Sequence, residues 1–429
     1  MAMRLPSLVY LFPIPAMLAL GIANPFSVKA DPPPPGVTWL DVKGVDALTT
    51  EVPRAFLSPL ADAGEQRYLE VLGEIAFSAP EILGTLARRS ELSCQSCHVN
   101  GTVNPELFID GLSARKGGLD VTSDLFHANA EDGIANHLDV PSLHGIFATP
   151  PYGRRGSFAT LRDFTRHVIV NEFAGDNPKP HLLDALIAFQ NRFEFPVNPQ
   201  LHANGDLATA GDAAWRGEGI FRRPFPHAPK LSCASCHRGP NFTDSVQHDV
   251  GSGGLFDTPT LRGIATTAPY LHDGRAASLG DVVTHFDTFY RIGLDASQQA
   301  DLVTYLETIG AVEHRTVHVT LSAELQAIDR FRWLLGEAIN KKRYEDASLA
   351  VAVARRRIGT LHARFDRDHQ MMARQVLISW SRALQGAGRA VNAADPQAAR
   401  FAFLAFTSAF WEMAPTVFEQ SAGARINVQ

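Results

Sequence analysis

The sequence predicts a mainly α-helical protein with two related domains in tandem and a C-terminal helical bundle. Three observations predict this fold class. A Cys-x-x-Cys-His pentad occurs twice, at residues 94–98 and 233–237. A proline-containing motif follows each pentad, and its two copies are separated by one fixed offset. Beyond residue 313, apolar residues recur at helical spacing in a segment that has no cysteine.

The first thirty residues have the composition of a secretory signal peptide. Arg4 precedes an apolar run from Leu8 to Ala23, and Val28-Lys29-Ala30 places small residues before Asp31. The run is short and interrupted by prolines, which disfavours a membrane span and leaves an uncleaved anchor as the alternative. We therefore expect residues 1–30 to be removed and the mature protein to lie in the periplasm without a stable membrane span.

The chain without this segment is mildly acidic. Arg4 and Lys29 are two of its 39 lysines and arginines, so 37 remain against 45 aspartates and glutamates. Nucleic-acid binding needs clustered excess Lys and Arg, so we expect no nucleic-acid partner. An apolar content of 45% excludes a disordered chain, and the length suffices for two or three domains. The expected partner is a small molecule or another exported protein.

All four cysteines lie in the two pentads. Two thiols at this spacing can each form a thioether with a haem vinyl group, while the adjoining histidine ligates the iron. The sequence therefore predicts two covalently bound haems c, and hence two cytochrome c-like haem domains in tandem. Structural disulfides and a zinc site are the alternatives. The predicted attachment and ligand residues are Cys94, Cys97 and His98 in one domain, and Cys233, Cys236 and His237 in the other.

The chain repeats itself downstream of the pentads. The stretches 140–146 and 150–157 recur at 258–264 and 268–275: Pro259 follows Pro141, and Tyr270 follows Tyr152, by 118 positions. The pentads are farther apart, because Cys233 follows Cys94 by 139 positions, so the first domain has a longer loop. We expect a boundary between residues 196 and 204. The predicted organisation is a first haem domain at 31–200, a second at 201–312 and a helical tail at 313–429.

Helical periodicity predicts helices around each pentad and through the tail. In the tail, Met371, Met372, Trp380 and Trp411 are expected to lie in the core rather than to contact a cofactor. The expected helices are residues 61–77, 160–170, 182–193, 210–221, 278–290 and 297–309 in the haem domains, and 321–339, 349–365, 371–384 and 401–411 in the tail.

The second domain carries motifs of a known family. Asn241–Asp244, His248, Phe256–Gly263 and Ala268–Gly274, together with the pentads and the doubled domain, resemble the bacterial di-haem cytochrome c peroxidases. The similar branch includes the methylamine-utilisation di-haem enzyme, which oxidises tryptophans in a partner protein. The resemblance covers roughly residues 65–310, is weaker in the first domain and does not extend to the tail.

The resemblance implies different roles for the two haems. His98 would be the proximal ligand of the peroxide-reacting iron, and His237 that of the iron that feeds it electrons. The family uses a glutamate as its acid–base group, and Val170–Phe173 resembles that stretch with two residues deleted, so Glu172 is the candidate catalytic residue. The alternative for Glu172 is an exposed carboxylate at a helix end. The family often has a calcium ion between the domains, and the resemblance implies one here without identifying its ligands.

The sequence departs from the family at the second iron. The peroxidases proper have a methionine fourteen residues after the histidine equivalent to His272, and the tryptophan-oxidising branch has a tyrosine there, whereas this chain has Phe286. No methionine lies between Met17 and Met371. The second haem is therefore His/His, His/Tyr or five-coordinate. The candidate distal ligands are His285, His272 and Tyr290.

A second departure concerns the residue between the haems. The peroxidases place a tryptophan there, and the repeat puts Arg154 at that position, where it either binds haem propionates or is solvated in a loop. Trp215 is expected in a helix core rather than in an electron relay. The first domain has further histidines, among them His127, His137, His144 and His167. If one of them binds the first iron, that haem is closed at rest.

Together these features predict a periplasmic di-haem c-type oxidoreductase that is peroxidase-like. It would reduce hydrogen peroxide, or use peroxide or another small oxidant to oxidise a substrate, with electron transfer between its haems. An exported electron-donor protein is the expected partner. The alternative is a non-catalytic di-haem electron-transfer cytochrome that serves a dehydrogenase or oxidase. An open iron beside Glu172 would favour the enzyme, and two bis-histidine haems the carrier.

Overall fold

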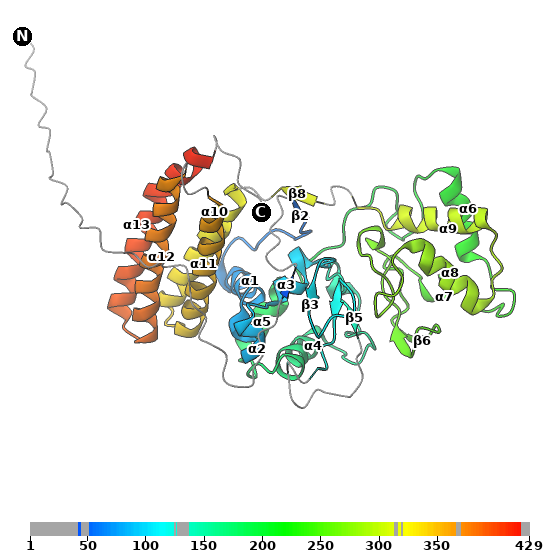
Figure 1. The fold of residues 1–429 in the computed structure, drawn as a ribbon, viewed down its shortest axis with the longest axis horizontal. Coiled ribbons are helices and arrows are strands. Elements are labelled where there is room, and N and C mark those ends of the chain that lie inside the picture. Colours follow the sequence, from blue (N-terminus) through cyan, green and yellow to red (C-terminus); the bar gives the residue numbers. More distant parts are fainter. Residues whose placement is uncertain are drawn as a thin grey trace, which may run out of the picture.

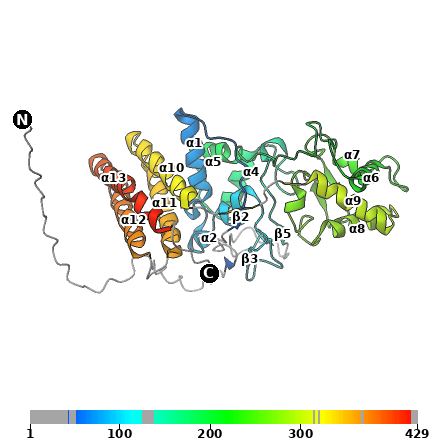
Figure 2. The same cartoon turned by 90° about the horizontal axis from the view of Figure 1, so that it is seen from above.

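The computed structural model describes residues 42–43, 51–123, 126, 137–312, 316–318, 321–365 and 370–421. The predicted signal peptide and His127 lie outside these residues. Within them the chain is mainly α-helical, as predicted, and its strands form two-stranded antiparallel pairs. No helix in this part of the chain combines the length and the apolar character that crossing a membrane requires. Figures 1 and 2 show a helical bundle (residues 321–421) at one end and residues 201–312 at the other, with residues 51–200 between them.

The first segment (residues 51–200) packs short helices around the first pentad. Cys94 and Cys97 lie against a core of aliphatic and phenylalanine side chains that includes Leu107, Ile109 and Phe193. Its helices are α1 (Gly64–Phe77), η1 (Pro80–Ile82), α2 (Thr85–Arg89), α3 (Cys94–Cys97), η2 (Val99–Gly101), η3 (Ile146–Ala148), α4 (Leu161–His167), η4 (Val168–Glu172) and α5 (Pro180–Gln190). Its strands are β2 (Glu51–Pro53), β3 (Phe108–Ile109), which pairs with β1 (Val42–Lys43), and β4 (Gly118–Leu119), which pairs with β5 (Leu138–Asp139).

The second segment (residues 201–312) has a separate core that includes Phe221, Leu302 and Tyr305, and Cys233 packs against it. Its elements are α6 (Asp212–Arg222), α7 (Cys233–Cys236), the antiparallel pair β6 (Gln247–Asp249) and β7 (Leu255–Asp257), η5 (Ile264–Thr266), α8 (Leu279–Tyr290) and α9 (Ala296–Ile309).

The repeat of the sequence is present in the backbone of the two segments. Gly145 and Gly263 both adopt left-handed φ angles, of 71° and 77°, and each begins a short 3-10 helix, η3 or η5. Helices α4 and α8 then start at equivalent positions, each after a hydroxyl side chain that accepts from the backbone of the third residue of the helix. In both segments a glycine lets the helix before the pentad cross the last helix closely. Gly73 meets the backbone of Ala185, and Gly217 meets that of Asp301.

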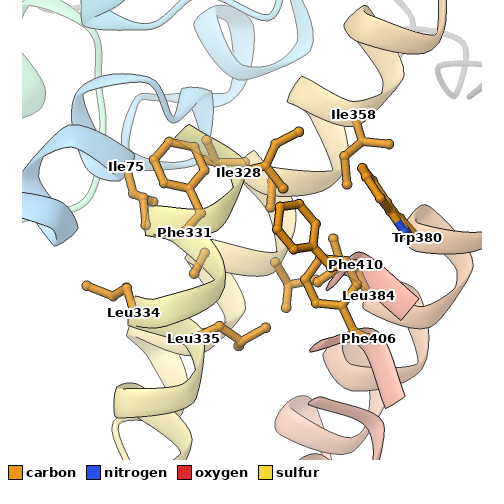
Figure 3. Close-up of a cluster of buried hydrophobic side chains, with 14 of the residues drawn as sticks. Ile75, Ile328, Phe331, Leu334, Leu335, Ile358, Trp380, Leu384, Phe406 and Phe410 are labelled. Carbon is orange, nitrogen blue, oxygen red and sulfur yellow. The ribbon is translucent and has the colours of Figure 1, made fainter. Parts of the chain in front are cut away.

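The bundle consists of α10 (Leu321–Asn340), α11 (Tyr344–Arg364), α12 (Met371–Asn392) and α13 (Pro396–Ser421). All ten predicted helices are present, although α11, α12 and α13 extend beyond the predicted limits. Asp395 caps α13 by accepting from the backbone N–H groups of Gln397 and Ala398, both at 3.0 Å. Figure 3 shows the core between these helices, into which Ile328, Phe331, Leu384, Phe406 and Phe410 project.

Only one of the four bundle residues expected in the core is buried. Trp380 is completely buried, and its indole N–H donates to the carbonyl oxygen of Ala409 at 3.1 Å. The other three are exposed: Met371 by 61%, Met372 by 54% and Trp411 by 56%. The two methionines lie in the first turn of α12 on the side away from the core, because the next residue, Ala373, is completely buried. Trp411 follows the buried Phe410 and points away from the buried side of α13.

The bundle shares a core with the first segment. Tyr68, Leu72 and Ile75 of α1 belong to the same buried cluster as Phe331 and Leu335 of α10, whereas the last residues of α1 contribute to the core of the first segment. A buried polar network and ion pairs reinforce this contact. The Tyr68 hydroxyl donates to Asp346 Oδ2 at 2.8 Å, His181 Nε2 lies 2.8 Å from Asp346 Oδ1, and Arg330 pairs with Glu74 at 2.6 Å.

Candidate haem sites

Each pentad forms a single helical turn held by the same cap. Ser93 and Ser96 cap α3, and Ser232 and Ser235 cap α7, in reciprocal capping boxes between the side chain of one serine and the backbone of the other. A turn of this length places the two cysteines at its first and last positions, with the histidine directly after it. The two thiols and the imidazole are thus held on one short rigid unit in both segments.

The two pentad histidines are oriented alike by backbone carbonyls. His98 Nδ1 lies 2.9 Å from the carbonyl oxygen of Pro141, and His237 Nδ1 lies 3.0 Å from that of Phe242. Donation from Nδ1–H leaves Nε2 as the lone-pair nitrogen, which is the arrangement that an iron ligand needs. Burial lowers the pKa of His98 to about 4 and also lowers that of His237, which favours the neutral imidazole in both. The residues of both pentads therefore fit a haem c.

The alternatives to haem receive little support from the geometry. All four cysteines are free thiols in the structure, so no disulfide links them. The cysteine and histidine ligand atoms of a pentad do not converge on one point as a zinc site requires. Across the described residues, the group of three that does converge is Cys236, Asp244 and His248, with ligand atoms within 4.8 Å of one another.

Glu172 lies beside the first pentad. It ends the π-helix η4, an element that recurs at functional sites, and its side chain is 20% exposed. Burial raises the pKa of Glu172 to about 7. Burial, and after it the nearby Cys94 and Glu172, raise the pKa of the Cys97 thiol to about 12. His167 Nε2 lies 3.8 Å from Glu172 Oε1. The carboxyl group is therefore not the exposed helix-end group that was the alternative for it.

The two segments meet through a contact with pseudo-twofold symmetry. The backbone N–H of Asp139 donates to the carbonyl oxygen of His272 at 2.9 Å, and that of Asp257 donates to the carbonyl oxygen of Arg154 at 3.0 Å. Asp257 follows Asp139, and His272 follows Arg154, by 118 positions, which is the offset of the repeat. Equivalent residues therefore make the contact from both sides, as in an isologous dimer interface.

Four buried polar side-chain atoms at this contact have no hydrogen-bond partner within the described residues. They are Asp139 Oδ1, Asp257 Oδ1, Arg154 Nε and His272 Nδ1. Burial raises the pKa of Asp139 to about 7 and that of Asp257 to about 6. Buried polar atoms without partners are costly, so the arrangement fits a further polar group between the segments. The unpaired guanidinium N–H of Arg154 fits the carboxylate of a haem propionate.

Arg154 is an interface residue and not a solvated loop residue. Its side chain is 24% exposed and pairs with Asp139 Oδ2 at 3.0 Å. The sequence reasoning missed Asp139 and Asp257, although a signal was present: an aspartate directly precedes the repeated proline motif in both copies.

The candidate distal ligands of the second haem lie in different surroundings. His285 Nε2 is 2.8 Å from the carbonyl oxygen of Val250, so this nitrogen is already hydrogen-bonded. His272 stacks on Phe256 in the contact between the segments, with ring centres 3.9 Å apart. Tyr290 stacks on Phe225 at 4.6 Å, and its pKa is raised by burial and then by Cys236 and Cys233. Tyr290 is thus the candidate that lies near the second pentad.

His137, His144 and Trp215 are the remaining candidate residues of the two segments. His137 and His144 are both shielded at Nε2, and neither of these atoms has a hydrogen-bond partner within the described residues. Burial lowers the pKa of His144 to about 4. Trp215 is 44% exposed, so its expected place in a helix core is wrong. The reason is that α6 buries the side of Ala214 and Phe221, and Trp215 lies on the other side.

Comparison with known proteins identifies the relationship. Residues 223–373 match the model of the family described as di-haem cytochrome c peroxidase. The chain is related to the di-haem cytochrome c peroxidases. The recognition of this family from the sequence is thereby confirmed, and the family implies haem c as the cofactor. The match contains the second pentad and continues through α10 and α11, so the expectation that the resemblance stops before the tail is wrong. These two helices follow α9 after strand β8 (Thr316–His318), and both contact α1.

Two relatives and one solved structure show how similar the chain is to known proteins. Hydrazine synthase subunit gamma of Kuenenia stuttgartiensis is 30% identical over 189 residues, which cover 32% of this chain and 51% of that protein. Methylamine utilization protein MauG of Methylorubrum extorquens is 28% identical over 290 residues, which cover 56% and 77%. A solved structure of the Kuenenia stuttgartiensis hydrazine synthase aligns with a TM-score of 0.42 and 23% identity, over 65% of this chain and 98% of that one. The chain thus spans about half the length of the first of these relatives.

Proposed function

We propose that the chain is a periplasmic di-haem c-type oxidoreductase with peroxidase-like activity. The observation that carries this proposal is Glu172, a largely buried carboxyl group beside the first pentad whose pKa burial raises to about 7. A group poised to exchange protons at neutral pH suits peroxide chemistry. Simple electron carriage needs no such group.

In this proposal each segment holds one haem. Residues 31–200 and 201–312 are the two haem domains, and residues 313–429 are the helical tail. The Cys94 and Cys97 thiols attach the first haem, and the Cys233 and Cys236 thiols attach the second. His98 and His237 supply the proximal ligands through Nε2, supported by their hydrogen bonds to backbone carbonyl oxygens.

Proton transfer falls to residues of the first segment. When bound, the first haem would supply an iron at which hydrogen peroxide accepts electrons. Ionised Glu172 accepts the proton of the nearer peroxide oxygen and returns it to the farther oxygen, which leaves as water. Reduction of one hydrogen peroxide consumes two electrons and two further protons and yields two waters. His167, 3.8 Å from Glu172 and 37% exposed, connects this carboxyl group with solvent protons.

Electrons would reach the first site through the second segment. The donor is an exported protein, and hydrogen peroxide or another small oxidant is the acceptor. Arg154 stands where the family has a tryptophan, and arginine cannot be oxidised, so we assign it an electrostatic role in holding propionates between the haems. The calcium ion that the resemblance implies stays a proposal without assigned ligands. Of the converging group, Cys236 is taken by haem attachment.

Spectroscopy of the purified holoprotein tests the proposal. Optical and electron paramagnetic resonance spectra are recorded oxidised and reduced, before and after hydrogen peroxide, and peroxide consumption is followed with a reductant in excess. We expect a high-spin haem at rest or after partial reduction, a spectral response to peroxide and steady consumption. Two low-spin haems that are inert to peroxide in both redox states would contradict the proposal and favour the electron-transfer cytochrome.

A further inference from the structure

The loop that leads into the second pentad has an unusual charge pattern for this chain. The protein has 45 acidic residues among 429 and a formal net charge of −6. Residues 219–243 contain no aspartate or glutamate, whereas they contain four basic residues besides histidine. These are Arg222, Arg223, Lys230 and Arg238.

Three of these four cations are exposed and free of acidic partners. Arg222 is neutralised, because it pairs with Asp206 at 2.7 Å and with Glu218 at 2.8 Å. Arg223, Lys230 and Arg238 are exposed, and within the described part of the chain none of them forms an ion pair. We call these three side chains the basic rim.

The basic rim flanks the second pentad along the chain, with Arg223 and Lys230 before it and Arg238 directly after it. The loop folds back on itself, because the Phe225 N–H donates to the carbonyl oxygen of Leu231 at 2.8 Å, and Arg223 and Lys230 lie at the two ends of this closure. Its Phe225 ring stacks on Tyr290. On the other side of the pentad, the Arg238 N–H donates to the carbonyl oxygen of Cys236 at 3.1 Å.

The same end of the molecule, away from the bundle, also has exposed apolar side chains. Leu231 is 38% exposed, and Trp215 on α6, the helix that leads into the loop, is 44% exposed. Figures 1 and 2 show α6 and α7 at the opposite end from α10–α13, so the bundle does not obstruct this surface. A cationic rim with apolar side chains is the pattern of a transient, electrostatically steered protein interface.

We propose that the basic rim docks an acidic electron-donor protein at the edge of the second haem. This inference rests on the proposed function, and it specifies the charge of the partner. An acidic donor is repelled by the net negative chain elsewhere and attracted here, which orients the encounter. Each encounter would transfer one electron from the reduced donor to the second haem, whose ferric iron, held by His237, would become ferrous.

Stopped-flow reduction of the oxidised holoprotein tests this docking. The probe is flavodoxin hydroquinone, an acidic protein that is oxidised to the semiquinone as it transfers one electron. We expect the second-order rate constant to fall steeply between ionic strengths of ~10 mM and ~300 mM. The triple variant Arg223→Glu, Lys230→Glu and Arg238→Glu should lose at least about tenfold in rate at the low ionic strength, and most of the salt dependence.

A matched variant separates local from overall charge. Arg382→Glu, Arg389→Glu and Arg400→Glu change three exposed arginines of the bundle and alter the net charge equally; we expect the wild-type rate. Equal losses in the two triple variants, or no loss in the rim variant, would overturn the proposal. So would binding of the wild type to anionic phosphatidylglycerol vesicles that the rim variant alone loses, because the surface would then face lipid.

The test is independent of peroxide chemistry. Dithionite reduction in each variant checks that both haems are attached and reducible. A protein that is reduced through the rim but does not consume peroxide would refute the peroxidase-like function and leave the docking surface intact. Peroxide consumption with a small reductant, together with a wild-type reduction rate in the rim variant, would support the peroxidase-like function and refute the docking surface.

Discussion

Glu172 combines burial, a position at the end of a π-helix and proximity to Cys97. Its raised pKa has a defined consequence for activity. The ionised carboxylate is the form that accepts the peroxide proton, so the reactive fraction grows as pH rises through about 7 and declines below it. Activity falls toward low pH because burial makes the Glu172 carboxyl group a weaker acid. At pH 5 this group is protonated and cannot act as a base.

The substitution Glu172→Gln removes this base with little change of shape. We expect kcat/KM for hydrogen peroxide to fall by about 10²–10⁴-fold and its rise through pH 7 to disappear. The control is Glu194→Gln, an exposed glutamate of the same segment, which should behave as wild type. Haem content is measured by the pyridine haemochrome spectrum. Wild-type turnover in the Glu172 variant, with full haem content, would remove its assigned role.

Substitutions of Tyr290 and His285 should affect the second haem differently. Because His285 Nε2 already meets the carbonyl oxygen of Val250, we expect His285→Gln to leave the electron paramagnetic resonance spectrum of this haem unchanged. If Tyr290 is the distal ligand, Tyr290→Phe should alter that spectrum and raise the reduction potential, since a tyrosinate ligand would stabilise the ferric iron. The reverse pattern in the two variants would make His285 the ligand.

Both segments have a pair of helices that cross closely at a glycine. At Gly217 an added Cβ would run into the backbone of Asp301 on α9, so the two helices would have to separate. We expect Gly217→Ala to destabilise the protein by about 1–3 kcal/mol, although alanine favours the helical conformation. Gly219→Ala on the same helix meets nothing within 4 Å and should be neutral or stabilising by up to about 1 kcal/mol. Guanidinium unfolding of both variants checks the difference, and equal stabilities would show that α6 and α9 do not pack as described.

The sequence predicts those features that depend on neighbours along the chain. The ten helices follow from periodicity, and the pentads reveal their chemistry through spacing alone. Burial depends on what packs against an element, so Trp411 and Met371 are predicted in the core although more than half of each side chain is exposed in the described chain. The role of Asp139 likewise depends on Arg154 and on the carbonyl oxygen of His272, which lies in the other copy of the repeat. A single copy of the motif does not contain that information.

At the scale of the whole molecule, α1 couples the bundle to the first segment. Asp346 of α11 accepts from the Tyr68 hydroxyl and lies against His181, so α11, α1 and α5 meet at one buried carboxylate. We expect Asp346→Ala to cost about 2–3 kcal/mol, because it leaves the completely buried Tyr68 without its acceptor. The exposed neighbour provides the control: Glu345→Ala loses a surface pair with Lys179 and should cost less than about 1 kcal/mol.

The same coupling predicts how the bundle and the first segment unfold. Circular dichroism, which reports mainly on helices, and absorbance of the first haem should lose signal in one transition, shifted to lower denaturant in the Asp346 variant. Melting of the bundle while the first segment stays folded would show that the shared core does not unite them.

The pairing of β2 with β8 (Thr316–His318) has a consequence for the order in which the protein assembles. Its two strands are separated by more than 260 residues, and Val52 meets Val317 at the centre of the pairing. If the chain is exported as proposed, with its N-terminus crossing the membrane first, β2 emerges long before β8. Both pentads have emerged by then, so haem attachment can precede the closure of this strand pair. On this proposal, the ladder between Glu51–Pro53 and Thr316–His318 would form late in assembly.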